Sequence, residues 1–120
     1  MGSTMRKILC IDDHRATVLT LAMVFRGAGY CCTTAENFDQ AEYAFSHEEV
    51  DLVIVDHGLP NVNGAELAAH LKKIRPVQVL MLSGSPDLHS KPDSVDLLLP
   101  KPIAPEALLK AVAGLLANLN

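Results

Sequence analysis

Four consecutive apolar residues in the middle of the chain, Leu52 to Val55, run directly into a carboxylate, Asp56. A loop rich in Gly, Pro and Asn follows at once and ends at Gly64. A short apolar run bounded by turn-forming residues is typical of a strand that is buried on both faces. In open parallel sheets, ligands bind beyond the carboxyl ends of such strands. The stretch therefore predicts that Asp56 lies at the functional edge of a parallel sheet.

The rest of the chain alternates short apolar runs with stretches of helical periodicity. The other predicted strands are Lys7 to Ile11, Tyr30 to Ala35, Val77 to Leu82 and Asp96 to Leu99. Between them, apolar residues recur at the three- and four-residue spacing of a helix face. These faces are Val18, Leu21, Ala22 and Phe25; Phe38, Ala41 and Phe45; Leu67, Leu71 and Ile74; and Leu108, Ala111, Val112 and Leu115. Continuously apolar strands imply an α/β fold, with a parallel sheet covered by helices on both faces.

One link in this alternation differs from the others. Between Ser83 and Asp96, the prolines Pro86 and Pro92 stand among Asp and Ser residues. Proline in a helix interior removes a hydrogen bond and clashes with the preceding turn. We therefore expect any helix in this link to be short or irregular.

Length and composition limit what the domain can be. With 120 residues, the chain is long enough for one core and too short for two. Its net charge of −4 argues against direct binding to nucleic acid. No apolar stretch reaches the roughly 20 residues of a membrane-spanning helix, and no signal peptide is visible. We expect residues 6–120 to form the domain and residues 1–5 to be an N-terminal extension or a cloning remnant.

The cysteines indicate the compartment. Cys10, Cys31 and Cys32 show no C-x-x-C spacing of the kind that binds metals. Cys10 and Cys31 lie within apolar runs, which favours small buried thiols in a reducing environment. We expect a cytoplasmic location without membrane association.

The chemically useful side chains all follow predicted strands. Asp12 and Asp13 end the first strand, Asp56 the third and Ser83 the fourth, and Lys101 follows the fifth. Because the carboxyl ends of parallel strands meet at one edge, these side chains should lie close together. Clustered carboxylates repel one another unless a cation lies among them, and Mg²⁺ prefers carboxylate, water and phosphate oxygens. An aspartate in such a site can act as a nucleophile and become an acyl phosphate.

Four short motifs carry these residues in order: Ile11-Asp12-Asp13, Val55-Asp56 with Leu59-Pro60 and Gly64, Ser83-Gly84, and Lys101-Pro102. Together they resemble the receiver domain of two-component response regulators, and the likeness covers Arg6 to Asn120. The resemblance implies a flavodoxin-like, doubly wound sheet of five parallel strands with helices on both faces. It also implies a phosphorylation-driven signalling switch.

In a domain of this kind, Asp56 would accept a phosphoryl group from a phosphohistidine of a sensor histidine kinase or a phosphotransfer protein. The reaction would depend on Mg²⁺. The resemblance implies that Asp13 and Asp56 bind the metal directly, Asp12 through water, and Gly58 through its backbone carbonyl. Such a domain is not a conventional enzyme, but it promotes phosphorylation and dephosphorylation of its own aspartate and thereby changes its binding to a downstream protein effector.

The resemblance also assigns the switch residues, with two departures from the family pattern. Lys101 would contact the phosphoryl group, and Ser83 would hydrogen-bond it and draw the following loop inward. Leu98, however, stands three residues before the lysine, where receivers usually carry Tyr or Phe. The link between Ser83 and Lys101 is also shorter than usual, and it belongs to the face that commonly contacts output partners. We expect intact chemistry at Asp56 and an atypical output face.

Several alternatives stay open at this point. Asp12 and Asp13 could merely cap a helix, since Asp is favoured at helix N-termini. The chain could be a receiver-like interaction module that acts without regulated phosphorylation, or a Mg²⁺-dependent phosphohydrolase, although so short a chain shows no lid or substrate pocket. His57, directly after the phosphoacceptor, could alter water access to an acyl phosphate. The sequence does not identify the kinase or the effector, and it leaves homodimerisation open.

The histidines carry no metal signature in the sequence. His14, His47, His57, His70 and His89 show no metal-ligand spacing. We expect them at the surface.

Overall fold

A five-stranded parallel sheet forms the middle layer of the structure, a computed structural model that describes residues 5–84 and 90–117. The strands are β1 (Lys7–Ile11), β2 (Cys31–Ala35), β3 (Leu52–Asp56), β4 (Gln78–Ser83) and β5 (Leu97–Pro100). Their order is β2-β1-β3-β4-β5, and every neighbouring pair is parallel. This confirms the predicted doubly wound sheet. The order reverses between β1 and β3, the place where open α/β sheets bind their ligands.

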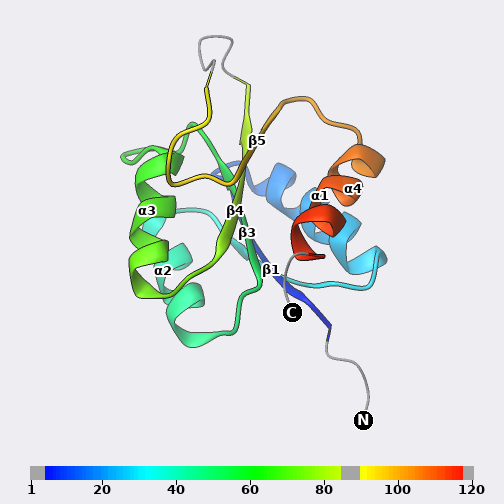
Figure 1. The fold of residues 1–120 in the computed structure, drawn as a ribbon, viewed down its shortest axis with the longest axis horizontal. Helices are drawn as coiled ribbons and strands as arrows, with labels where there is room; N and C mark the ends of the chain where they lie inside the picture. The colour runs from blue at the N-terminus through cyan, green and yellow to red at the C-terminus, as the bar shows by residue number, and fades with distance from the viewer. Residues whose placement is uncertain (1–4, 85–89, 118–120) are drawn as a thin grey trace.

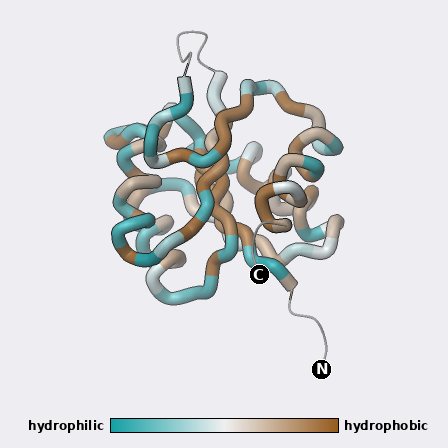
Figure 2. Tube along the Cα trace, viewed as in Figure 1, coloured by the Kyte–Doolittle hydropathy of each residue, from teal (hydrophilic) through white to brown (hydrophobic). Residues whose placement is uncertain are grey.

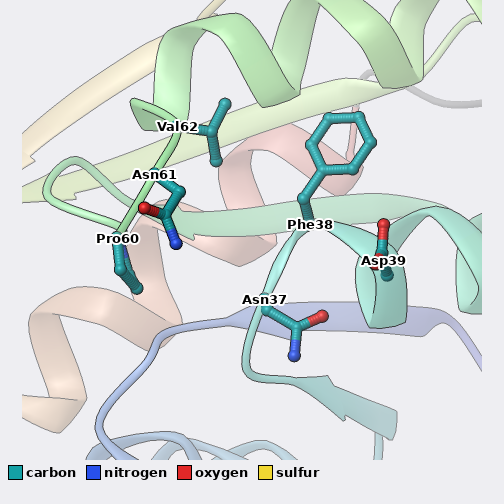
Figure 3. Close-up of a pocket in the computed structure, with 6 residues that line it drawn as sticks. All are labelled: Asn37, Phe38, Asp39, Pro60, Asn61 and Val62. Carbon is teal, nitrogen blue, oxygen red and sulfur yellow. The ribbon is translucent and has the colours of Figure 1, made fainter.

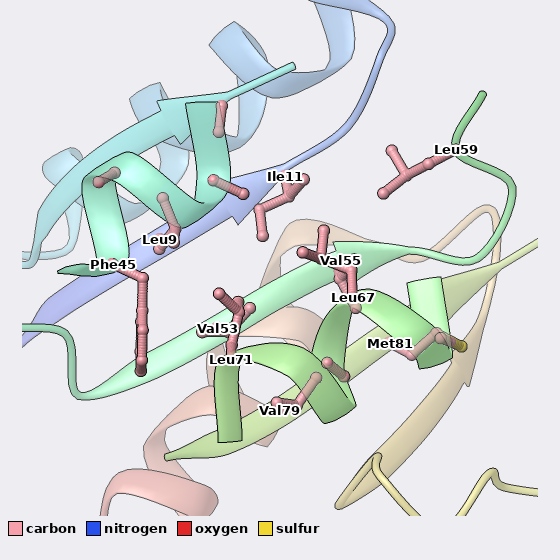
Figure 4. Close-up of a cluster of buried hydrophobic side chains, with 14 of the residues drawn as sticks. Leu9, Ile11, Phe45, Val53, Val55, Leu59, Leu67, Leu71, Val79 and Met81 are labelled. Carbon is pink, nitrogen blue, oxygen red and sulfur yellow. The ribbon is translucent and has the colours of Figure 1, made fainter. Parts of the chain in front are cut away.

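Helices cover both faces of the sheet (Figure 1). The helices α1 (Arg15–Gly27) and α4 (Pro105–Leu116) pack on one face, and α2 (Phe38–His47) and α3 (Gly64–Ile74) pack on the other. Side chains alternate along each strand, so each central strand supplies both cores. Leu9, Val53, Val55 and Met81 face α2 and α3 (Figure 4), whereas Ile8, Cys10, Ile54 and Leu80 face α1 and α4.

The central strands are almost completely buried, and the apolar segments of the chain concentrate along them (Figure 2). Burying one Val, Leu or Ile side chain contributes about 1.5–3 kcal/mol, which explains why the continuously apolar runs formed strands rather than exposed loops. Most predicted helix-face residues are buried or half-buried. The prediction is wrong for Ile74, which is the last residue of α3 and is 39% exposed.

The link between β4 and β5 contains no helix over its described part, residues 84 and 90–96. This agrees with the prediction for that part, while Pro86 and His89 lie outside the described residues. Val95 is buried in the core between the sheet and α3, and the Ser94 hydroxyl donates to the Ala65 carbonyl at 2.8 Å. Asp96 accepts hydrogen bonds from the Val79 backbone and from Lys72, both at 2.8 Å. The link is therefore held against α3 and β4 by specific contacts.

The cysteine prediction was partly wrong. Cys10 is buried as expected, but Cys31 is exposed and Cys32 is buried in its place. Cys31 is the first residue of the edge strand β2, and Cys32 is the neighbour whose side chain faces the core. The sulfurs of Cys10 and Cys32 lie 3.4 Å apart, and this hydrogen bond together with burial raises the pKa of Cys10 well above its usual value.

Over residues 5–84 and 90–117, no helix combines the length and the hydropathy that a membrane crossing requires.

Candidate functional site

Side chains from the ends of three strands meet at the carboxyl edge of the sheet. Asp56 is the last residue of β3, Asp12 follows β1, and Lys101 follows β5. The Lys101 ammonium lies 2.6 Å from Asp56 Oδ1 and 3.3 Å from Asp12 Oδ2. The Lys101 backbone N–H donates to the Ser83 carbonyl at 2.8 Å, which ties the lysine to the end of β4. The convergence expected for a parallel sheet is present.

The environment keeps the Lys101 ammonium charged. Burial by itself would lower the pKa of Lys101, but the hydrogen bond to Asp56 and the charge of Asp12 outweigh this effect and raise the pKa. Asp12 and Asp56 are both buried, with 1% and 8% of their surfaces exposed. Buried carboxylates need charged or hydrogen-bonding partners, and here one ammonium serves both.

The loop after Asp56 is fixed by backbone contacts. The Gly58 N–H donates to Asp56 Oδ2 at 3.2 Å, and the Gly64 N–H donates to the His57 carbonyl at 3.1 Å. A Cβ atom at Gly64 would lie 2.4 Å from the Asp56 carbonyl oxygen, so a side chain there has no room. Asn63 and Glu66 then form a reciprocal capping box at the start of α3. The loop thus holds the Asp56 carboxylate in a defined position.

The two acidic residues that follow β1, Asp12 and Asp13, lie beside a histidine. Asp12 Oδ1 accepts the backbone N–H of His14 at 2.9 Å. The ring atom His14 Nδ1 lies 3.2 Å from Asp12 Oδ1 and 3.3 Å from Asp13 Oδ1. His14 itself is the N-cap of α1 and makes no side-chain capping bond within the described chain. Asp12 and Asp13 therefore do not cap this helix, and that alternative is wrong.

The acidic edge has the composition of a cation site. The Asp13 Oδ1 atom is buried and accepts no hydrogen bond from the described residues. Asp12, Asp13 and His14 each offer a ligand atom, and these atoms lie within 4.8 Å of one another. A buried carboxylate oxygen without a donor is costly unless a cation or ordered water serves it. The residues present therefore fit a divalent metal ion.

The switch residues predicted from the sequence lie close to this edge. Ser83 is buried at the end of β4, 6% exposed. Leu98 is half-buried in β5, pairs in register with Met81 and packs against the core under α2 and α3. Leu98 is thus an aliphatic side chain at the position where the sequence resemblance implies an aromatic ring in most receivers.

The surface also has two shallow pockets near the site. One lies between the start of α2 and the β3–α3 loop (Figure 3) and is lined by Asn37, Phe38, Asp39, Pro60, Asn61 and Val62. The other lies between α1 and the segment after β5, and Lys101 contributes to its lining together with Thr17 and Leu21. The described residues that line the first pocket include none of the predicted site residues.

Comparison with known proteins gives the family. The family model described as the response regulator receiver domain matches residues 8–113. The chain belongs to this family. The receiver domain is 31% identical over 117 residues to the phosphate regulon transcriptional regulatory protein PhoB of Pseudomonas aeruginosa, covering 89% of this chain and 51% of that protein. It is 31% identical over 110 residues to the transcriptional regulatory protein GlrR of Escherichia coli, covering 88% of this chain and 25% of that protein. The chain thus spans about half or less of these relatives' length.

Solved receiver domains share the fold. The signal receiver domain of an HD domain-containing protein from Pseudomonas fluorescens superposes with a TM-score of 0.87 and 27% identity, covering 95% of this chain and 96% of that chain. The response regulator TrrA of Thermotoga maritima, solved in complex with Mg(2+)-BeF, has a TM-score of 0.84 and 27% identity, covering 92% of this chain and 99% of that chain.

The sequence motifs did not predict one residue of the receiver domain's acidic edge. His14 was grouped with the surface histidines, and its side chain is indeed exposed, yet Nδ1 contacts both carboxylates. The available signal was its position directly after Asp12 and Asp13. Spacing rules for metal ligands do not register such a neighbour, because residues i and i+1 share a site only where the backbone turns.

Proposed function

We propose that this receiver domain accepts a phosphoryl group on Asp56 from a phosphohistidine of a sensor histidine kinase or a phosphotransfer protein, in a Mg²⁺-dependent reaction. The observation that carries the proposal is the Lys101 ammonium, which is shared by the buried carboxylates of Asp56 and Asp12. The family match and the relatives that are transcriptional regulators support the same class of function.

The transfer is a displacement at phosphorus. A carboxylate oxygen of Asp56 forms the new P–O bond, and the P–N bond to the histidine breaks with its electron pair returning to the imidazole. Lys101 Nζ already lies 2.6 Å from Asp56 Oδ1, so it can donate to a phosphoryl oxygen after a small movement. Catalysis of phosphoryl transfer rests mainly on positioning and charge neutralisation, and the lysine supplies both.

The metal would be held by Asp13, Asp56 and the Gly58 backbone carbonyl, with Asp12 acting through water. When bound, Mg²⁺ would neutralise the charge of the phosphoryl oxygens and orient the phosphoryl group for attack at phosphorus. Asp12 suits an indirect role because its oxygens already contact Lys101 and His14. Asp13 suits a direct role because its buried Oδ1 has no hydrogen bond from the described residues.

The response to phosphorylation is proposed to run through Ser83 and an atypical output face. The Ser83 hydroxyl would bind a phosphoryl oxygen and pull the segment after β4 toward Asp56. Leu98 has no polar tip that could follow it, and Ser94, Val95 and Asp96 anchor the link to the sheet and α3. The downstream protein effector would therefore meet a surface shaped by this link.

A phosphorylation assay tests the proposal. The receiver domain is incubated with Mg²⁺ and acetyl phosphate, and the adduct is located by peptide mass spectrometry after reductive trapping of the acyl phosphate. We expect one modified residue, Asp56, and no adduct in Asp56→Asn or without divalent metal. Modification elsewhere, or none at Asp56, would contradict the proposal.

The anchored link favours a second candidate, an interaction module without a phosphorylation response. Beryllofluoride with Mg²⁺ mimics the acyl phosphate, and hydrogen exchange reports the response. Changed protection in β4, β5 and α4 supports the switch. Binding of beryllofluoride at Asp56 with unchanged protection there supports the interaction module.

A further inference from the structure

The His14 ring contacts two carboxylates, and one hydrogen bond from the ring cannot satisfy both of them. Its Nδ1 atom faces Asp12 Oδ1 at 3.2 Å and Asp13 Oδ1 at 3.3 Å. Three electron-rich atoms face one another stably only around a proton or a metal ion. A proton on Nδ1 serves Asp12 through a hydrogen bond, but Asp13 Oδ1 stays buried without one among the described residues. A metal ion bound to Asp13 Oδ1 and His14 Nδ1 would serve both of these atoms, and Asp12 would face it through water.

The ring is held in place by the backbone despite its exposure. The His14 N–H donates to Asp12 Oδ1 at 2.9 Å, and its carbonyl accepts the Val18 N–H at 3.0 Å in the first turn of α1. These two bonds fix the backbone at the junction of β1 and α1. The backbone therefore places His14 next to Asp12 and Asp13, and the contacts of Nδ1 with their carboxylates orient the ring.

The spacing matches neighbouring ligands of one ion. Two ligand atoms at about 2.1 Å from an octahedral metal and at right angles are separated by about 3.0 Å. The separation of 3.3 Å between His14 Nδ1 and Asp13 Oδ1 would need to shorten only slightly. All three ligand atoms lie within 4.8 Å of one another.

We propose that His14 is a metal-selecting ligand of this site. Imidazole nitrogen suits Ni²⁺, Cu²⁺ and Zn²⁺, whereas Mg²⁺ strongly prefers oxygen. Mn²⁺ lies at the weak-binding end of the same first-row series, and its paramagnetism lets it report which atoms bind it. With His14 Nδ1 and Asp13 Oδ1 bound to the same ion, the site favours a divalent transition metal over Mg²⁺ more than an all-oxygen receiver site does. The inference rests on the proposed metal site, shares its ligand Asp13 and adds a nitrogen donor beside it; the ligand atoms that lie within 4.8 Å of one another are those of Asp12, Asp13 and His14.

Manganese binding tests the role of His14 directly. Mn²⁺ titrations followed by electron paramagnetic resonance give the affinity, Mg²⁺ competition gives the selectivity, and electron spin echo modulation detects a ¹⁴N nucleus bound to Mn²⁺. We expect a nitrogen signal in the wild-type domain and its loss in His14→Ala. We also expect about tenfold weaker Mn²⁺ binding in this variant, with Mg²⁺ affinity changed less than about twofold.

Two further variants make the test decisive. His57→Ala removes the histidine next to Asp56 and should keep the nitrogen signal, and Asp13→Asn should abolish Mn²⁺ binding at the site. A nitrogen signal that persists in His14→Ala, or that disappears in His57→Ala instead, overturns the inference. Nitrogen-free Mn²⁺ binding that Asp13→Asn removes overturns the role of His14 alone and leaves the proposed function standing. No metal binding at all overturns both.

Discussion

The Lys101 ammonium lies 2.6 Å from Asp56 Oδ1, although the two residues are 45 positions apart in the chain. Asp56 ends β3 and Lys101 follows β5, with β4 between these strands. The lysine reaches across because its backbone is bonded to the Ser83 carbonyl at the end of β4. This pair connects the proposed acceptor carboxylate to the part of the chain proposed to respond to it.

Removing the Lys101 charge should impair phosphorylation. In Lys101→Met, phosphoryl oxygens lose their nearest ammonium, and we expect the rate of adduct formation from acetyl phosphate to fall by about tenfold or more. Lys110→Met is the matched control, because Lys110 is exposed on α4. Adduct formation at the wild-type rate in Lys101→Met would refute this role.

The same ion pair sets a pH dependence of stability. The pKa of Lys101 is raised above its ordinary value of 10.5. A raised folded-state pKa means that the pair contributes fully below the unfolded-state value and loses its contribution only as the pH rises through the folded-state pKa. We expect the difference in unfolding free energy between wild type and Lys101→Met to stay constant from neutral pH to about pH 9. Urea denaturation at several pH values measures it, and a drift across this range would contradict the shift.

Gly64 should be the least replaceable glycine described in the structure. A Cβ atom there would lie 2.4 Å from the Asp56 carbonyl oxygen and 3.0 Å from Met81 Cε. We expect Gly64→Ala to cost about 1–3 kcal/mol of unfolding free energy and to displace Asp56. In the control Gly114→Ala, a Cβ atom would meet no described atom within 4 Å, so better helix propensity should stabilise α4 by about 0.5–1 kcal/mol. Equal effects of the two substitutions in urea denaturation would contradict this explanation.

Asp96 should contribute more to the unfolding free energy than its ion-pair partner, Lys72. It accepts the backbone N–H of buried Val79 and also contacts half-buried Lys72. Asp96→Ala leaves that amide without its partner and should cost about 1–3 kcal/mol, whereas Lys72→Ala should cost less than about 1 kcal/mol. Thermal or urea denaturation of the two variants decides the order. A larger loss in Lys72→Ala would show that the ion pair, and not the backbone bond, anchors the link.

The thiols should differ sharply in reactivity. Cys31 is exposed, whereas Cys10 and Cys32 are buried and hydrogen-bonded to each other. Iodoacetamide should alkylate Cys31 in the folded domain and all three cysteines in urea, as read by peptide mass spectrometry. Alkylation of Cys10 at the rate of Cys31 would mean that the α1 face of the sheet opens readily.

The sequence by itself determined the layers and the edge at which the chemistry lies. A continuous apolar run such as Leu52 to Val55 is typical of a strand that is buried on both faces of a parallel sheet. Once the strands are parallel, the residues after them must share an edge, so Asp12, Asp56 and Lys101 could be grouped from their positions alone. The periodicity of apolar residues predicts the strands, the helices and the shared edge because it depends only on local residue types.

The tertiary structure alone decided where individual side chains point at strand ends and loops. In the structure, Cys32 and not Cys31 is buried in the core, and the His14 ring contacts two carboxylates. It also buried Val95 where the prolines had predicted only an irregular link. These outcomes depend on which neighbours fill the adjacent space and which polar atoms lack a partner. Both are properties of the assembled sheet and helices, and no local pattern in the sequence encodes them.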